Sequence, residues 1–230
     1  MSEPRAIAID GPVASGKTAV GRLVARRLRI RFLDTGAMYR AVTWMALRRG
    51  TDLEDEEALA RVARGLSWRL VPGKTGAGPG QTSRERLLVD GQDMTDHLVD
   101  PDVERGVSIV AKAPEVRVPL VERQRAIAMA GPIVMVGRDI GTVVLPRADV
   151  KVYLQASVEV RTQRRYLEME RRGEAVDYAQ VLSETARRDR IDSERADSPL
   201  RPADDAIVID TAEFGVEELV QMVLGYVERG

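Results

Sequence analysis

One eight-residue segment constrains the fold of this chain more than any other feature. Residues 11–18 read GPVASGKT and match the phosphate-loop pattern G-x-x-x-x-G-K-[ST] in full. Residues 5–10 form an apolar run that predicts a buried strand, and residues 17–29 have apolar side chains at helical spacing. In a strand–loop–helix unit of this kind, backbone N–H groups and the helix dipole converge on phosphate oxygens. The segment therefore predicts a binding site for a nucleoside triphosphate.

The residue types within the loop have separate tasks. Lys17 is expected to reach the terminal phosphates as a point charge, and Thr18 can offer its hydroxyl to Mg²⁺, a hard cation that prefers oxygen ligands. We therefore predict that ATP and Mg²⁺ bind here, with Thr18 as the metal ligand. The residues expected to contact ATP are Gly11, Pro12, Val13, Ala14, Ser15, Gly16, Lys17, Thr18 and Ala19.

Predicted strands and helices alternate along the chain, which indicates an α/β fold. The predicted strands are residues 5–10, 31–34, 133–137, 150–154 and 205–210. The predicted helices are residues 17–29, 37–49, 55–65, 101–113, 115–129, 157–172, 178–194 and 216–229. Because strands joined by helices are connected with right-handed crossovers, we expect a five-stranded parallel sheet flanked by helices, of the P-loop NTPase type.

The segment at residues 66–98 differs from the rest of the chain. Residues 67–71 and 84–90 alternate like strands, and the Gly- and Pro-rich residues 72–83 between them predict a flexible hairpin connection. We therefore expect a small β-rich insertion at 66–98. The core domain is then expected at 1–65, 99–156 and 196–230, with a separate pair of helices at 157–195.

The composition excludes several kinds of site and partner. The chain has no Cys and one His, His97, so a thiolate nucleophile, a Cys-ligated metal and a Ser-His-Asp triad are excluded or very improbable. A net charge of -1 argues against broad coating of nucleic acid. No apolar stretch approaches the ~20 residues that cross a bilayer, and the N-terminal apolar run is too short for a signal peptide. We expect a cytoplasmic monomer with small-molecule partners.

The basic residues are unevenly divided between the two types. Only four of the 35 are Lys, and all others are Arg. Codon bias or adaptation to heat would explain this surplus, and so would recognition of phosphates by guanidinium groups. The sequence alone leaves both explanations open.

Two further segments follow predicted strands. DTGAMYR at residues 34–40 follows the second strand, and VGRDIGTVVLP at 136–146 ends another. Ligands of open α/β sheets bind at the carboxyl ends of the strands. We therefore expect Thr35, Arg40, Arg138 and Asp139 to converge with the phosphate loop.

With these segments, the chain resembles the bacterial cytidylate kinases, short P-loop kinases that phosphorylate CMP and dCMP. The resemblance covers nearly the whole chain. It also includes DGQDMT at 90–95, VSIVAKAPEVR at 107–117 and RRDRIDSERADSPLRPADDAIVIDT at 187–211. It implies that 66–98 binds the nucleoside monophosphate and that 157–195 is a helical lid. The chain departs from the family at Thr35, where Ser is frequent, and at Leu98-Val99, where Ile-Arg is common.

The resemblance also implies which residues surround the cytosine ring: Thr35, Ser108, Arg117 and Asp139. This set is chemically reasonable, because cytosine presents an amino donor beside acceptors at N3 and O2. Asp139 can accept from the amino group, and Arg117 can donate to the acceptors. Uracil has a carbonyl in place of the amino group, so a carboxylate there would lose its partner, at a cost of ~1–3 kcal/mol.

The remaining implied contacts are to the phosphate and sugar of the acceptor. By resemblance, Arg40 and Arg138 clamp the acceptor phosphate, and Arg188 and Asp192 contact its sugar. Arg195 is implied to be a lid arginine drawn toward phosphate. The residues expected to act in catalysis are Lys17, Arg138 and Arg188.

Other interpretations of these residues stay open. Ser108 could be an ordinary helical Ser, Arg117 a surface charge, and Asp139 a cap residue or a support for Mg²⁺. Arg188 and Arg195 could lie on a solvated helix face. The chain could also be a kinase of UMP, AMP or shikimate, or a nucleotide-dependent switch. The sequence lacks the guanine-reading N-K-x-D motif, which weighs against a GTP switch.

Overall fold

The computed structural model describes residues 6–71 and 86–229. The predicted hairpin connection at 72–83 therefore lies outside the described residues. The chain divides into two compact units, Met1–Ile30 with Pro132–Gly230, and Arg31–Gly131. Each unit is described by itself below.

The main sheet has five strands in the order β2-β6-β1-β7-β8. The pairings β1–β6, β1–β7 and β7–β8 are all parallel. The central strands are buried on both faces, which explains why they read as continuous apolar runs. The strands are β1 Ala6–Asp10, β2 Arg31–Asp34, β6 Ile133–Gly137, β7 Val150–Gln155 and β8 Ile207–Asp210. The prediction of a five-stranded parallel sheet flanked by helices is confirmed.

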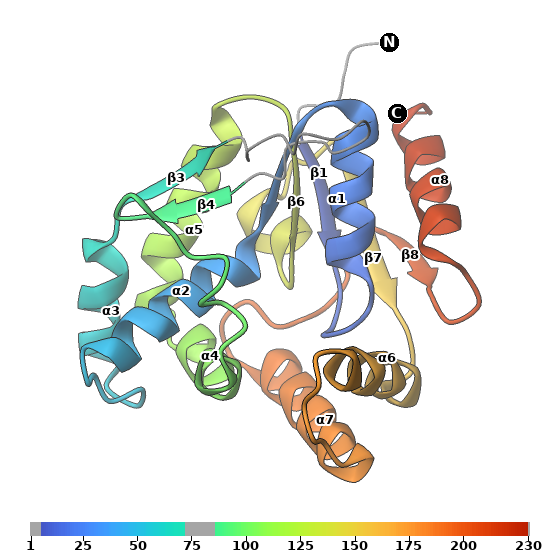
Figure 1. Ribbon diagram of the computed structural model, residues 1–230. Coiled ribbons are helices and arrows are strands. Elements are labelled where there is room, and N and C mark those ends of the chain that lie inside the picture. The colour runs from blue at the N-terminus through green and yellow to red at the C-terminus, as the bar shows by residue number, and fades with distance from the viewer. Residues whose placement is uncertain (1–5, 72–85, 230) are drawn as a thin grey trace, which may run out of the picture. The chain divides into compact units, whose positions relative to one another are not determined.

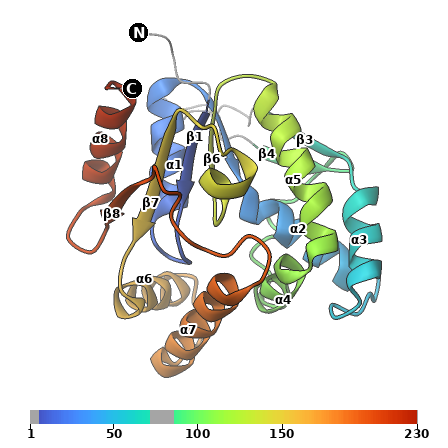
Figure 2. The same ribbon diagram turned by 180° about the vertical axis from the view of Figure 1, so that it is seen from behind.

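Four helices belong to the unit that carries the phosphate loop, and they occupy two kinds of position. In Figure 1, α1 packs along the face of the sheet and α8 runs beside it, whereas α6 and α7 lie together beyond the carboxyl ends of β1 and β7. The view from behind shows a short helical turn, residues 140–144, on the other face of the sheet (Figure 2). The four helices are α1 Lys17–Leu28, α6 Val158–Arg171, α7 Tyr178–Glu194 and α8 Val216–Val227.

The second unit combines four helices with a small antiparallel sheet. In this sheet β3 pairs with β4 and β4 with β5, so the predicted strands around the hairpin are confirmed and a two-residue strand is added. The strands are β3 Trp68–Val71, β4 Arg86–Val89 and β5 Gln92–Asp93. The helices are α2 Thr35–Arg48, α3 Glu56–Gly65, α4 Pro101–Lys112 and α5 Pro114–Met129. The roles of 66–98 as a substrate-binding insertion and of 157–195 as a lid stay predictions.

Local capping explains where the helices differ from the predicted ranges. α2 begins at Thr35, two residues before the predicted start, because the Asp34 side chain accepts a hydrogen bond from Gly36 N at 2.9 Å and caps the helix. Pro114 begins α5 rather than separating two helices, since proline suits the first turn of a helix. None of the helices in the described part of the chain is long and apolar enough to cross a membrane.

Candidate active site

The phosphate loop begins with a glycine that no other residue could replace without strain. Gly11 follows β1 and has a φ of 154°. A Cβ atom at this position would lie 2.2 Å from the carbonyl oxygen of Leu154 and 2.8 Å from Ser15 Oγ. Gly11 therefore lets the loop pass close to the end of β7. This close approach explains why the motif requires glycine here.

The rest of the loop leaves donors that suit a polyphosphate. Gly16, with a φ of 91°, precedes α1, whose first turn has no side-chain cap and no acidic residue. Ser15 is fully buried, and its Oγ has no hydrogen-bond partner within residues 6–71 and 86–229. Lys17 is 7% exposed, and its Nζ donates to the carbonyl oxygen of Pro12 at 2.8 Å. The start of α1 thus combines a first turn without a side-chain cap, the Ser15 hydroxyl and the Lys17 ammonium. Such a set of donors suits the binding of an anion.

A network of charged side chains lies at the end of β6 and the end of α7. Arg138 Nε donates to Asp192 Oδ2 at 2.7 Å. Arg195 lies between two carboxylates, 3.9 Å from Asp192 Oδ1 and 3.9 Å from Asp139 Oδ1. All four residues belong to the unit with the phosphate loop, so the structure brings these predicted site residues together. A guanidinium held through Nε is oriented for bidentate binding of phosphate.

Burial in this network is nearly complete. It decides whether Arg188 and Arg195 lie on a solvated helix face. Arg188 and Arg195 are each 7% exposed, so they do not lie on a solvated helix face. Burial alone would raise the pKa of Asp192, but the positive charges of Arg138, Arg195 and Arg188 and the Arg138 hydrogen bond lower it below its usual range. Asp192 is therefore ionised at neutral pH and holds the arginines in place.

Arg161 connects the helix pair α6–α7 to the phosphate loop. Its guanidinium forms two bonds to the Asp189 carboxylate, at 3.0 and 2.6 Å, and a longer one to the Val13 carbonyl oxygen, at 3.4 Å. The side chain is buried, although it lies on a helix rich in exposed charges. Arg161 is not among the site residues that the sequence analysis names. Helical spacing could not predict these contacts, because Asp189 lies on α7 and Val13 lies in the phosphate loop.

Asp10 is a buried carboxylate that sequence reasoning missed. It is the last residue of β1, and its two oxygens accept hydrogen bonds from Ile140 N at 2.8 Å and Gly141 N at 2.7 Å. Burial raises the pKa of Asp10 to about 6, against the lowering effect of these two bonds and of the Lys17 charge. The available signal was a carboxylate ending an apolar strand directly before the loop.

Asp10 produces a pH dependence of stability whose sign follows from its pKa. Between about pH 4 and pH 6 the unfolded chain releases this proton and the folded chain keeps it, so stability is lost as the pH rises. Relative to Asp10→Asn, the free energy of unfolding of the wild type should fall by roughly 3 kcal/mol between pH 4 and pH 7. Urea unfolding followed by circular dichroism tests this. A difference that is constant over this range would contradict it.

The second unit carries four of the predicted site residues. Thr35 is the first residue of α2 and is 3% exposed. Arg40, one turn further along, has its Nη2 3.5 Å from Asp34 Oδ2. A Cβ at Gly36 would lie 3.0 Å from Asp34 Oδ1 and 3.2 Å from Arg40 Nη1, so glycine leaves room for this pair. The DTGAMYR segment is thus a compact turn in which Asp34 both caps the helix and orients Arg40.

Arg117 is the most deeply buried of these side chains. It is 2% exposed, its Cζ lies 5.6 Å from the ring centroid of Tyr39, and its Nη1 donates to the Ala111 carbonyl oxygen at 3.2 Å. Ala111 lies in α4, three residues after Ser108, which is 7% exposed. These contacts exclude the interpretation of Arg117 as a surface charge. A charge buried this deeply requires charge-assisted partners or an ordered polar surrounding.

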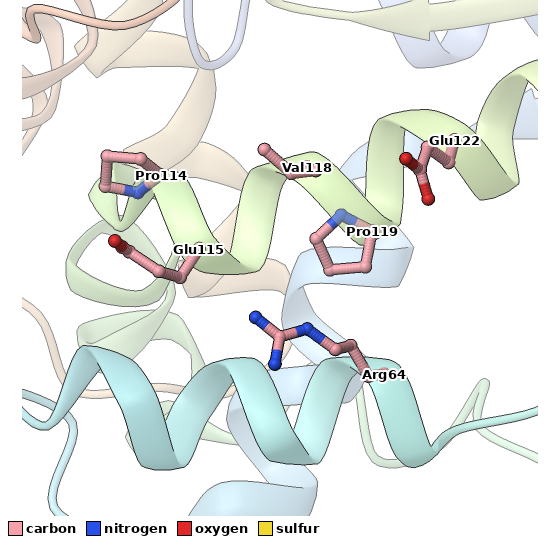
Figure 3. Close-up of a pocket in the computed structure, with 6 residues that line it drawn as sticks. All are labelled: Arg64, Pro114, Glu115, Val118, Pro119 and Glu122. Atoms are coloured by element: carbon pink, nitrogen blue, oxygen red, sulfur yellow. The ribbon is translucent and has the colours of Figure 1, made fainter.

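An open cavity lies elsewhere in the second unit, between α3 and α5 (Figure 3). Arg64 extends from α3 toward α5 in this view. The lining residues are Arg64, Pro114, Glu115, Val118, Pro119 and Glu122. None of them is a predicted site residue, and none continues a strand end. The candidate site residues form two groups, those that follow β1 and β6 and those of α7 in the first unit, and those that follow β2 and those of α4 and α5 in the second.

Comparison with known families gives the same result as the motifs. A family model described as cytidylate kinase matches residues 7–229. The chain belongs to the cytidylate kinase family. The cytidylate kinase of Rhodococcus opacus is 48% identical over 95% of this chain and 92% of its own length. That of Geobacillus kaustophilus is 48% identical over 100% of this chain and 99% of its own, and that of Bacillus subtilis 43% over the same shares.

Solved structures are similar to this cytidylate kinase family member in fold alone. A gluconokinase from Sinorhizobium meliloti matches with a TM-score of 0.51 and 13% identity, over 100% of this chain and 94% of the other. At this identity the shared property is the helix-flanked parallel sheet. The choice of acceptor therefore depends on the family match and on the side chains described above.

Proposed function

We propose that this chain transfers the γ-phosphoryl group of ATP to the α-phosphate of CMP or dCMP, forming CDP or dCDP. One observation carries the proposal. The turn that holds Arg138 and Asp139 is hydrogen-bonded directly to Asp10, the residue before the phosphate loop. Arg138, which suits a second phosphate, and Asp139, which suits a base, are therefore anchored next to the first residue of the phosphate loop. Membership of the cytidylate kinase family supports cytosine as that base.

The proposed reaction needs positioning and charge more than it needs a general base. The acceptor is already a phosphate anion, so no strong base has to remove a proton before attack. Lys17 neutralises charge on the terminal phosphates of ATP, and Arg138 and Arg188 neutralise charge on the group being transferred. Arg40 holds the acceptor phosphate together with Arg138. These roles agree with the burial of Lys17 and Arg188 and with the orientation of Arg138 by Asp192.

The proposed recognition of the acceptor divides the assigned residues between the base and the sugar. Thr35, Ser108, Arg117 and Asp139 are assigned to cytosine, and Arg188 and Asp192 to the sugar. The deep burial of Arg117 and Asp139, 2% and 4% exposed, supports a role beyond solvation. Asp139 accepts from the exocyclic amino group, and the Arg117 guanidinium donates to N3 or O2. Because both groups are buried, a base with the wrong pattern would leave them unpaired.

We further propose that Thr18 holds Mg²⁺ together with the phosphates of ATP. When bound, Mg²⁺ would supply positive charge that offsets the negative charge of the phosphates. The Thr18 hydroxyl, in the first turn of α1, fits this ion, since Mg²⁺ usually binds few protein ligands and several phosphate or water oxygens. The residues assigned to ATP are the loop itself, from Gly11 to Ala19, with Ser15 offering its buried hydroxyl.

We propose that the helices at 157–195 act as a lid that excludes water and limits ATP hydrolysis. Arg195 is assigned to phosphate when the lid is closed. The Arg161 contacts with Asp189 and Val13 support a mechanical link between these helices and the loop. We also propose that the protein acts as a monomer in the cytoplasm on free nucleotides, without nucleic-acid or membrane partners.

A substrate panel tests the proposed function. ADP formation from ATP is measured with CMP, dCMP, UMP, AMP and shikimate as acceptors. CMP and dCMP should have the highest kcat/KM. A higher value with UMP, AMP or shikimate would replace the proposal by one of those kinases, and ATP hydrolysis that no acceptor accelerates would favour a nucleotide-dependent switch.

The base assignment makes a prediction about specificity. In Asp139→Asn the carboxylate becomes an amide that can donate as well as accept, so the preference for an amino group weakens. The ratio of kcat/KM for CMP to that for UMP should fall by about 10-fold or more. The coupled assay with both acceptors measures it. A ratio equal to that of the wild type would remove Asp139 from the set that contacts the base.

A further inference from the structure

The turn that carries Asp139 has an unusual cap. Residues Ile140–Val144 form a single π-helical turn, in which Val144 N donates to the Asp139 carbonyl oxygen at 3.1 Å and Leu145 N to that of Ile140 at 2.7 Å. The first N–H groups of a helical turn have no partner within it. Here those of Ile140 and Gly141 both donate to the carboxylate of Asp10, at 2.8 and 2.7 Å. The side chain that caps this turn therefore belongs to β1, far away in the sequence.

Asp139 itself occupies the position from which an aspartate ordinarily caps a helical turn. Asp139 thus stands at the cap position, but its side chain makes no capping hydrogen bond. Its Oδ1 instead lies 3.9 Å from Arg195 Nη2, and the side chain is buried. Two carboxylates compete for one cap position, and Asp10 occupies it.

We propose that Asp10 is a positioning residue that caps the π turn and thereby keeps the Asp139 carboxylate directed at the acceptor base. The inference rests on the base contact proposed for Asp139. Because Asp10 directly precedes Gly11, the same residue fixes the turn relative to the start of the phosphate loop. The orientation of the base-reading group is thus set by the strand that also presents the triphosphate site.

A second buried charge holds the far side of the turn. Lys151, on β7, donates through Nζ to the Pro146 carbonyl oxygen at 2.6 Å and to both oxygens of Asp205 at 2.9 and 2.8 Å. A Cβ atom at Gly141 would lie 3.3 Å from Lys151 Cδ and 3.4 Å from Asp10 Oδ2. Gly141 therefore lets the turn lie against both side chains, and little space remains for the turn to move while Asp10 holds it.

The variant Asp10→Asn tests this inference, because an amide keeps one acceptor and points a donor at the second N–H group. The turn is then held less firmly, and the Asp139 carboxylate is free to turn away from the base. The CMP/UMP ratio of kcat/KM should fall about 10-fold, and the KM for ATP should change by no more than about 2-fold. In an Asp139→Asn background the same change should not lower the ratio further, since both substitutions remove one interaction.

The matched control is Asp149→Asn. Asp149 accepts a hydrogen bond from Ala6 N at 2.8 Å, at the opposite end of the same strand, and its substitution should leave the ratio unchanged. If kcat/KM fell equally for CMP and UMP in Asp10→Asn, the inference would be overturned. A further fall of the CMP/UMP ratio in the double variant would overturn it as well. If Asp10→Asn does not fold, Gly141→Ala crowds the same contact from the turn and should lower the ratio in the same direction.

Amide exchange separates this inference from the proposed function. Loss of the cap should make the N–H groups of Ile140 and Gly141 exchange with solvent at least ~10-fold faster in Asp10→Asn than in the wild type. Unchanged exchange would overturn the inference. If Asp139→Asn has a normal CMP/UMP ratio but exchange is faster in Asp10→Asn, the cap is correct and the base contact of Asp139 is wrong.

Discussion

Lys17→Met should lower kcat for CMP phosphorylation by about 10³-fold, because one preorganised positive charge at the terminal phosphates is removed. The ammonium is buried and held 2.8 Å from the Pro12 carbonyl oxygen, so no neighbouring solvent ion can replace it with the same geometry. Methionine keeps the aliphatic stem of the side chain and removes the charge. The loss should appear in kcat rather than only in the KM for ATP, since charge on the transferred group is greatest in the transition state.

The measurement is a coupled assay of ADP formation at saturating CMP, with thermal unfolding to confirm that the variant folds. Lys112→Met is the matched control, because Lys112 ends α4 and has no assigned nucleotide contact. It should retain kcat within about 2-fold, as expected for a surface substitution. A Lys17→Met variant that folds and keeps near wild-type kcat would refute the assignment of Lys17 to the phosphates.

Arg138→Ala should reduce kcat/KM for CMP by about 10³-fold, the effect of losing an arginine that stabilises the transferred phosphoryl group. The substitution has a second consequence. Asp192 loses its 2.7 Å partner while it stays nearly buried, so the pKa of Asp192 rises toward its usual range. A modest fall in the melting temperature should therefore accompany the loss of activity.

Arg27→Ala is the control for Arg138→Ala. Arg27 pairs with Glu217 at 2.7 Å, the same length as the Arg138–Asp192 contact, but its side chain is 48% exposed. An exposed pair contributes little, so neither activity nor melting temperature should change appreciably. If Arg138→Ala behaved like Arg27→Ala, the phosphate clamp would be refuted, and the proposed function would have to rely on Arg40 alone.

The surplus of arginine illustrates how far composition can be interpreted. Arg27 is an exposed residue on α1 and fits the explanation by codon usage. Arg117, Arg161 and Arg195 are each less than 9% exposed and have specific carboxylate, carbonyl or ring partners, and Arg188 is equally buried. Burying a guanidinium is costly unless it is paired, so these residues need a reason that a compositional bias does not supply. The buried arginines therefore fit the explanation by phosphate recognition better than the exposed ones, and that recognition stays a prediction.

The elements that could be predicted are those whose signal is local. The phosphate loop, the core strands and most helix limits depend on neighbouring residues, and the structure confirms them. The start of α2 was missed because it depends on the Asp34 side chain, and the π turn at 140–144 because its hydrogen bonds need Asp10 as an outside partner. No periodic pattern records a bond between residues that are 130 positions apart.

By itself, the sequence determined the fold class, because a strand, a glycine turn and a helix in order specify a phosphate loop through backbone geometry alone. The resemblance of the further segments, such as residues 34–40 and 136–146, indicated the family. Only the tertiary structure decided which charged residues are buried and which carboxylate faces which arginine. In the sequence, Asp139 directly precedes the turn and is the plausible cap, whereas nothing local indicates Asp10. The register of β1 places Asp10 under the turn, and two backbone hydrogen bonds then settle which of the two carboxylates is the cap.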